Sequence, residues 1–289
     1  MASIVVRHSP SSPIRLSGTA TEFARNELHR TAGPLTVLGA FPTALYLGTA
    51  SGAVLALLAG DAVQLPIGVT VAGSSRSLPL DRYTGPARAA GGMLRVSGCV
   101  GTLDVVIGRL RPSALIPVGI PVPGQVAEAV RMLAATEIDP ALARRLAHAG
   151  DLQSTAEAVG ALLGRGLGLT PAGDDVLCGA LAGGVLFDRP LEVLRHVVLG
   201  ALAARPRATT SLSRQLLLSA VAGHGLVEVS ALGKAVCGTD SGILSAACAR
   251  LAAIGHSSGA ALGMGVLAMA GSSGNAAGSP GNAVEGTYW

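Results

Sequence analysis

The sequence predicts an α+β protein in which a β-rich domain, a barrel or a sandwich, precedes a helical domain. Two observations predict this order. Apolar runs of strand length, separated by Gly, Pro or charged residues, fill the chain up to about residue 117. Beyond Gly124 the apolar residues recur at helical spacing. We therefore expect a β-rich domain over residues 12–117 and a helical domain over residues 124–270.

The composition indicates a globular chain with a core of small aliphatic residues. Of its 289 residues, 49% are hydrophobic and 13% are charged, which excludes global disorder. Three Phe, three Tyr and one Trp leave Ala, Leu, Val and 40 Gly to build the core, which favours close helix packing. The Gly/Ser-rich tail over residues 271–289 is expected to be disordered.

The predicted strands and helices follow from these two patterns in chain order. A proline-crowded stretch around residues 112–123 reads as an extended linker between them. The strand-length runs are Leu35–Leu38, Ala44–Leu47, Ala53–Leu58, Ile67–Val71, Met93–Val96 and Val105–Ile107. In the second half, helices are expected over about 174–187, 190–204, 210–222, 226–236, 240–254 and 259–270.

Charge and cysteine usage narrow the classes of partner. The formal net charge is +4, but the arginines are scattered and too few aromatics accompany them, so we expect no nucleic-acid partner. Small acidic ligands remain compatible with this net positive charge.

The uncharged stretch over residues 31–60 is interrupted by Pro42 and several glycines, so we expect no membrane span. The cysteines lack C-x-x-C spacing and read as buried thiols of a cytoplasmic protein: Cys99, Cys178, Cys237 and Cys248.

The most informative motif is the glycine-rich loop GRGLGLTPAGDD over residues 164–175. Glycines at alternate positions indicate backbone that takes positive φ or approaches another group closely. Thr170 is suited to an N-cap and Pro171 to a first helical position, before an apolar helix. Such a helix start offers free N–H groups and the positive end of the helix dipole. The motif therefore predicts an anion site, although it matches neither the nucleoside-triphosphate loop nor the dinucleotide fingerprint.

Two consecutive acids, Asp174 and Asp175, stand at this anion site. They would repel a phosphate unless a cation or a proton intervenes. This favours Mg²⁺, a bound ammonium or amide group, or acid/base work. The alternative is a pair of acids that only match the dipole of the helix start. The residues leave the metal unknown; if Mg²⁺ is used, these two aspartates are its candidate ligands.

Two further polar clusters also precede helices. One runs from Arg205 to Arg214, with Thr209 or Thr210 as N-cap and arginines that suit a carboxylate or phosphate. The other is GHSSG over residues 255–259. Either could be no more than a capped, solvated helix start, but we predict that all three clusters converge on one cleft. The candidate catalytic residues are Asp174, Asp175 and His256, and the candidate anion-binding residues are Gly166, Gly168, Thr170, Gly173, Arg207, Thr209, Thr210, Ser213, Ser257, Ser258 and Gly259.

The motifs GxGxGLTPxGDD, TTxxS and GHSSG, in this order, resemble the AllH-type family, an accessory subunit of oxamate carbamoyltransferase. The likeness runs from about Phe41, through Leu65-Pro66, to about Gly271. It implies a subunit of a three-component enzyme that converts oxalurate and phosphate to oxamate and carbamoyl phosphate in anaerobic allantoin breakdown. The sequence departs from the family pattern at Arg165, Leu167, Ala172 and Ala261, so a related carbamoyl- or acyl-transfer system is an alternative.

The resemblance also implies partners. These are a small anionic ligand (oxalurate, oxamate, phosphate or carbamoyl phosphate) and other carbamoyltransferase subunits in a hetero-oligomer. One hypothesis is a catalytic or co-catalytic subunit; the other is a structural or ligand-sensing subunit whose partners hold the chemistry. The sequence shows no recognisable Ser-His-Asp or Cys-His motif of a nucleophilic enzyme, so no covalent intermediate is predicted.

Overall fold

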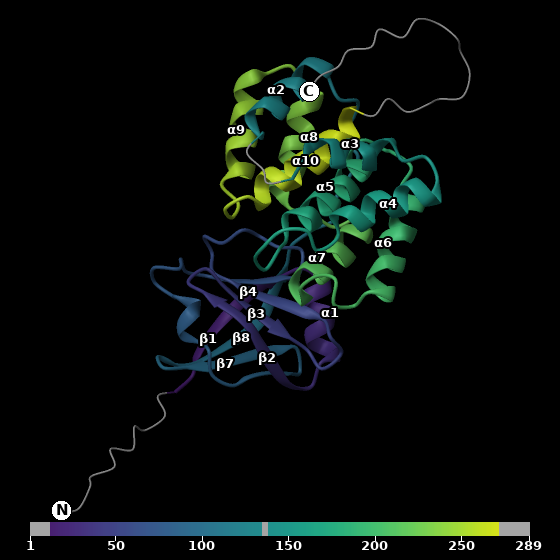
Figure 1. Ribbon diagram of the computed structural model, residues 1–289. Coiled ribbons are helices and arrows are strands. Elements are labelled where there is room, and N and C mark those ends of the chain that lie inside the picture. The colour runs from purple at the N-terminus through teal and green to yellow at the C-terminus, as the bar shows by residue number, and fades with distance from the viewer. Residues whose placement is uncertain (1–11, 135–137, 272–289) are drawn as a thin grey trace, which may run out of the picture. The chain divides into compact units, whose positions relative to one another are not determined.

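The computed structural model describes residues 12–134 and 138–271, which fall into two compact units divided after Pro112. The first unit is built of strands and the second of helices (Figure 1). The predicted α+β class and the order of its parts are therefore confirmed, and the β-rich part is a closed barrel rather than a sandwich. The tail expected to be disordered lies, apart from Gly271, outside the described residues.

Eight strands close the barrel in the order β1-β5-β4-β3-β2-β6-β7-β8. The parallel pairing of β1 with β8, with Leu16 opposite Val105, completes the ring, and β4 and β5 are also parallel. Each predicted apolar run forms a strand, whereas β1 and β6 were not predicted. The strands are β1 (Ile14–Ala20), β2 (Gly33–Phe41), β3 (Ala44–Gly48), β4 (Val54–Leu58), β5 (Gly68–Val71), β6 (Ala87–Ala90), β7 (Met93–Gly98) and β8 (Gly101–Leu110).

Small aliphatic side chains fill the barrel, as the composition predicts. Leu45, Leu47 and Leu57 are fully buried in its core. A helix that the sequence analysis missed, α1 (Glu22–Arg30), adds Ala24 and Leu28 to the same core. A short 3₁₀ turn, η1 (Leu80–Arg82), follows β5.

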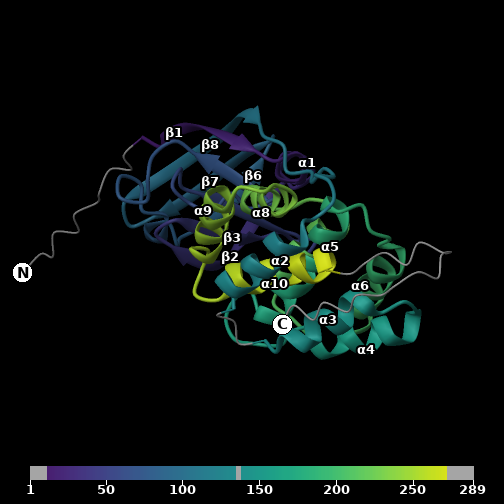
Figure 2. The same cartoon turned by 90° about the horizontal axis from the view of Figure 1, so that it is seen from above.

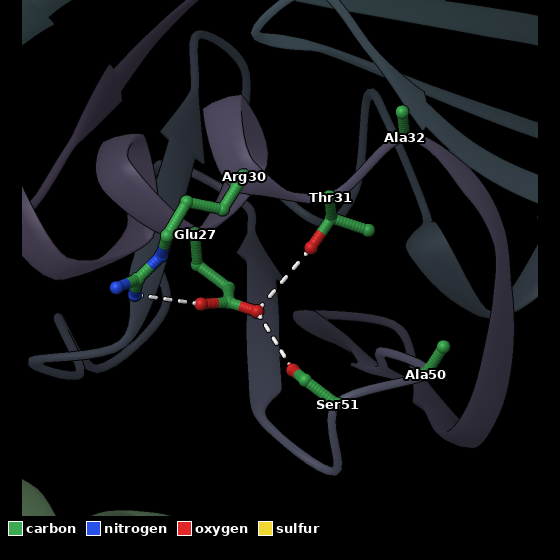
Figure 3. A pocket seen from close by; sticks show the side chains of 6 residues that line it. All are labelled: Glu27, Arg30, Thr31, Ala32, Ala50 and Ser51. Atoms are coloured by element: carbon green, nitrogen blue, oxygen red, sulfur yellow. Dashed lines mark hydrogen bonds and ion pairs between the residues drawn. The ribbon is translucent and has the colours of Figure 1, made fainter.

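A hollow in the barrel unit lies where α1 ends beside the turn between β3 and β4 (Figure 3). Glu27, only 5% exposed, sits at its centre. Its carboxylate accepts hydrogen bonds from Arg30 Nη2 at 2.8 Å, Thr31 Oγ1 at 3.2 Å and Ser51 Oγ at 3.1 Å. Both oxygens of this buried acid are thus occupied, and we interpret the cluster as the junction that ties α1 to the β3–β4 turn.

The second unit consists of helices joined by short loops. The six helices predicted between residues 174 and 270 are each present within two residues of the expected ends. The helices are α2 (Pro123–Met132), α3 (Pro140–His148), α4 (Leu152–Leu162), α5 (Ala172–Leu186), α6 (Glu192–Ala204), α7 (Ser211–Val221), α8 (Val227–Cys237), α9 (Ser241–Ala252) and α10 (Ser258–Gly271).

The central pair in this unit is α5 and α10, which lie side by side (Figures 1 and 2). A Cβ at Gly179 of α5 would overlap the carbonyl oxygen of Leu262, and a Cβ at Gly265 of α10 would overlap that of Val176. Because only glycine allows two backbones to approach so closely, these positions explain part of the high glycine content. The α5–α10 contact holds the start of each helix, and hence its preceding loop, in place.

The stretch from Arg111 to Val122 has no helix or strand apart from one isolated bridge, Ala114 to His224. Arg111 N–H donates to Ala20 O of β1, whereas Leu115 N–H donates to Gly223 O and Val118 N–H to Leu186 O within the helical unit. As expected of a linker, the stretch forms no helix, but most of it is attached to the helical unit. Pro123 is an exception, because it occupies the first turn of α2, where its missing N–H is not needed.

Two further expectations concern the burial of the cysteines and a membrane span. The four cysteines are free, and Cys178 and Cys248 are buried as expected, but Cys99 is exposed and Cys237 only partly buried. The prediction of four buried thiols is therefore wrong for Cys99, which lies in the tight β7–β8 turn where no core can cover it. Among the described residues, no helix has both the length and the apolar character needed to cross a bilayer.

Candidate functional site

The glycine-rich loop takes the backbone conformation that its sequence predicts. Gly164, Gly166 and Gly168 have φ of +74°, +114° and +93°, in the region that only glycine enters without strain. Gly164 has a second reason to be glycine, because a Cβ there would overlap the carbonyl oxygen of Ala208. The loop therefore lies directly against the segment that precedes α7.

The start of α5 differs from the expectation. The helix begins at Ala172 with Pro171 as N-cap, so the predicted cap at Thr170 is wrong by one residue. Pro171 O accepts the N–H groups of Asp174 at 2.9 Å and Asp175 at 3.1 Å, and Gly173 N–H donates to Arg165 O at 2.8 Å. The expected set of free N–H groups at the helix start is therefore largely engaged. The exposed amides of residues 166–169 have no backbone acceptor among the described residues, and anion contacts would come from them instead.

Asp174 joins three segments of the chain. Its side chain is 0% exposed and accepts three hydrogen bonds. Gly164 N–H donates to Oδ1 at 2.7 Å, Ser213 Oγ donates to Oδ2 at 2.7 Å, and the Thr209 hydroxyl also donates to Oδ2. This carboxylate thereby connects the glycine-rich loop, α5 and the start of α7. Its contacts are those of a structural acid.

Two hydroxyl contacts complete the cluster. Thr210 caps α7 by accepting the N–H of Ser213 at 3.0 Å, and its hydroxyl donates to Leu169 O at 2.5 Å. Thr170 Oγ1 and Ser258 Oγ are 3.0 Å apart, which brings the start of α10 to the loop. The structure thus brings segments of the three sequence clusters together at the N-terminus of α5, while the predicted shared cleft stays a prediction.

Asp175 is in a different state from Asp174. It is 5% exposed, and its Oδ2 has no hydrogen-bond partner within the described part of the chain. Burial, and to a smaller extent the charge of neighbouring Asp174, raise the pKa of this carboxyl to about 8, although the Ser258 and Thr170 hydroxyls oppose the shift. At neutral pH Asp175 is therefore mainly a protonated acid, with one oxygen unused by the protein.

This raised pKa predicts how stability depends on pH. An unfolded aspartate loses its proton near pH 4, whereas folded Asp175 keeps it until about pH 8, so the folded state binds the extra proton between these values. The free energy of unfolding should therefore fall as pH rises, by about 2 kcal/mol between pH 6 and pH 8 from this group alone. Urea unfolding of the wild type and Asp175→Asn at both pH values measures the difference.

Exposed Asp188, at the other end of α5, supplies the matched control for this comparison. Its φ of +51° suits Asn, so Asp188→Asn should keep the pH dependence of the wild type. An Asp175→Asn variant with that same pH dependence would contradict a protonated Asp175.

The remaining predicted residues fall into three groups. Gly173 and Gly259 have a packing reason, because a Cβ at either would overlap a backbone carbonyl oxygen, that of Leu162 or Leu251. His256 and Arg207 are exposed and make no hydrogen bond or ion pair with other described residues. Ser257 contributes its carbonyl oxygen to the N–H of Ala261 inside α10.

One further cation belongs with the site but was not selected from the sequence. Arg165 is exposed and follows Gly164, where a Cβ would overlap the Ala208 carbonyl oxygen, and Ala208 follows the exposed Arg207. Two cations therefore lie on adjoining loops beside Asp174 and Asp175. The sequence signal that could have identified Arg165 is a charged residue within a loop of otherwise small and apolar residues.

A magnesium ion held by the two aspartates does not fit this geometry. Both oxygens of Asp174 already accept hydrogen bonds, so the pair leaves only Oδ2 of Asp175 without a partner among the described residues, and one oxygen is too few to hold the ion. In the part of the chain that is described, no three His, Cys, Asp or Glu side chains gather as a metal site would require.

Comparison with known proteins identifies the segment that builds this site. A family model described as oxamate carbamoyltransferase subunit AllH matches residues 162–270. This segment is therefore similar to the AllH family. It starts at the last residue of α4 and ends within α10, so it contains the glycine-rich loop, both aspartates and the two hydroxyl clusters. The AllH resemblance is confirmed over these residues; the barrel unit, to which the expected likeness from Phe41 extended, lies outside the match. No curated protein and no solved structure matches the chain.

Proposed function

We propose that this chain is a subunit of an oxamate carbamoyltransferase complex and that it binds a small anionic ligand at the glycine-rich loop. The observation that carries the proposal is that the AllH match coincides with the site: the three matched polar clusters are joined by hydrogen bonds around Asp174 and Asp175. The reaction in which the subunit takes part would be the exchange of oxalurate and phosphate with oxamate and carbamoyl phosphate.

The loop offers the groups that an anion needs. The amides of residues 166–169 are exposed and without backbone acceptors, and positive-φ glycines allow them to turn toward one point. Arg165 and Arg207 add two exposed guanidinium groups on adjoining loops, and a guanidinium binds a carboxylate or a phosphate through paired hydrogen bonds. We assign the charged end of the ligand to these groups.

An exposed leucine supports the role of a subunit. Leu167, between the second and third glycines of the loop, is 92% exposed. A large apolar side chain at the tip of a ligand loop suits burial by another protein, which would also shield the ligand from water. We propose that a partner carbamoyltransferase subunit covers the loop at this residue.

The test uses the complex assembled from this chain and its partner subunits. The double substitution Arg165→Gln and Arg207→Gln should raise KM for phosphate or oxalurate about tenfold or more, because each removes charge-assisted hydrogen bonds to the ligand. Arg250→Gln, at an exposed arginine on α9, is the matched control and should leave KM unchanged. Steady-state kinetics and melting temperature are measured on the same samples.

Other outcomes separate the alternatives. A complex that is fully active without this chain, or whose KM is the same in the double variant and the control, would contradict the proposal. If the chain is required for assembly but the double variant alters neither KM nor kcat, the chain is a non-catalytic structural subunit. Turnover with another carbamoyl or acyl donor, and none with oxalurate, would assign it to a related transferase.

A further inference from the structure

We propose that Asp175 acts as a neutral carboxylic acid that donates a hydrogen bond from Oδ2 to the carbonyl oxygen of a carbamoyl group in the ligand. The inference rests on the proposed function and deepens it, because it assigns a residue to the carbamoyl end, H₂N–C(=O)–, of the proposed ligand and fixes which end of the ligand faces α5.

The first argument is the unused oxygen. Oδ2 of Asp175 is buried and without a partner among the described residues, and an unsatisfied buried polar atom is costly. The Thr170 and Ser258 hydroxyls, which are 3.0 Å apart, lie close enough to this carboxyl to lower its pKa, yet Oδ2 has no partner. A ligand group at Oδ2 would satisfy the remaining atom. Thr170 and Ser258 are both only partly buried, so this end of the site borders on solvent.

The second argument is the surrounding charge. Buried Asp174 precedes Asp175 on α5, and the Cys178 thiol lies one turn farther on, its own pKa raised by burial and by both aspartates. Along α10, which packs against α5, no residue from Ser258 to Gly271 is charged. The guanidinium of Arg214 on α7 donates to Leu202 O. Among the described residues of α5, α7 and α10, Arg214 is thus the only cation and none compensates a second negative charge beside Asp174, so Asp175 is stable as the neutral acid.

These surroundings favour a carbamoyl group over a second carboxylate. A neutral carbonyl oxygen accepts the Oδ2 proton without adding charge near Asp174, whereas a carboxylate placed there would be repelled. The N–H₂ of the same carbamoyl group can donate to a hydroxyl oxygen of Thr170 or Ser258. With its anionic end at the loop amides and arginines, such a ligand complements both ends of the site.

Oxamate and oxalate test this assignment, because they have nearly the same shape and differ in replacing a carbamoyl group by a carboxylate. Calorimetric titration of the full-length chain, and of the assembled complex, should show oxamate binding at least about tenfold more tightly than oxalate at pH 7. Because the proton on Asp175 is needed, the affinity for oxamate should fall about tenfold between pH 7 and pH 9.

Variants of Asp175 separate a proton donor from a carboxylate acceptor. Asp175→Asn remains a neutral donor, so it should bind oxamate within about threefold of the wild type at pH 7 and lose the decline toward pH 9. Asp175→Ala has no donor and should bind about ten- to a hundredfold more weakly. Asp188→Asn is the matched control and should behave as the wild type. Melting curves identify any variant that fails to fold.

Two results overturn the inference while leaving the proposed anion site intact. One is an affinity for oxamate that rises with pH, which would make Asp175 an ionised acceptor. The other is wild-type affinity in a folded Asp175→Ala variant. If neither the wild-type chain nor the complex binds oxamate or oxalate, both the inference and the proposed function are wrong.

Discussion

Gly179→Ala and Gly265→Ala should each lower the free energy of unfolding of the helical unit by about 3 kcal/mol or more. In both positions the new methyl group would overlap a backbone carbonyl oxygen of the facing helix, that of Leu262 or Val176. A side chain could rotate away, but a helix backbone moves only if α5 and α10 separate along their buried contact. For a unit of this size, such a loss lowers the melting temperature by about 6–12 °C.

Gly200 provides the matched control for these substitutions. It lies in α6 and is exposed, and apart from the backbone of its own helix no atom of the described residues lies within 4 Å of the position that a Cβ would occupy. Gly200→Ala should therefore stabilise the protein by about 0.5–1 kcal/mol through higher helix propensity and lower entropy of the unfolded chain. Differential scanning calorimetry compares the three variants. Unchanged melting of the Gly179 and Gly265 variants would contradict the close contact of α5 with α10.

Asp174→Ala should lower the free energy of unfolding by about 3–5 kcal/mol, the second large effect that the structure predicts. The substitution removes the acceptor of three hydrogen bonds in a fully buried location. The N–H of Gly164 and the hydroxyls of Thr209 and Ser213 would then have no partner there. The loss is larger than that of a helix-capping acid at the surface, because water cannot replace the lost bonds without entering the core.

Graded variants show whether the loss comes from these hydrogen bonds. Asp174→Asn keeps one acceptor oxygen and should lose about 1–2 kcal/mol, and Ser213→Ala removes a single donor and should lose about 1 kcal/mol. Urea unfolding gives the free energies, and limited proteolysis within residues 164–170 should accelerate in the same order because Asp174 anchors the loop. Equal stability of Asp174→Ala and the Asp188→Asn control would show that the Asp174 contacts contribute nothing.

Local sequence signals were sufficient for most of the elements. Runs such as Ala53–Leu58 are uninterrupted, apolar and flanked by Gly, so their extended conformation can be predicted without knowing the partner strand. The missed elements lack such signals. Strand β6 is ARAA and α1 is EFARNELHR, and both are stable because the closed barrel buries their few apolar residues. Closure of the barrel depends on the pairing of β1 with β8, the first and last strands of the unit. Because these strands are far apart in the sequence, no local pattern predicts their pairing.

The sequence also determined which segments would form the candidate site. Glycines at alternate positions permit positive φ, and a hydroxyl before an apolar run favours a helix start nearby. These effects act within a few residues, so the conformations of Gly164, Gly166 and Gly168 were predicted from the sequence, and the cap of α7 was narrowed to Thr209 or Thr210, of which the structure uses Thr210.

Only the tertiary structure separated the two adjacent aspartates. In the sequence Asp174 and Asp175 are equivalent acids at one helix start. Asp174 faces Gly164, Thr209 and Ser213, which supply donors to a carboxylate, whereas Asp175 is buried beside it with Oδ2 unpaired and its pKa raised to about 8. Successive positions on a helix point about 100° apart, so neighbours in the chain meet different surroundings. Burial and hydrogen-bond partners from distant segments decide whether each acid is charged, and the packing of α5 against α7 and α10 supplies them.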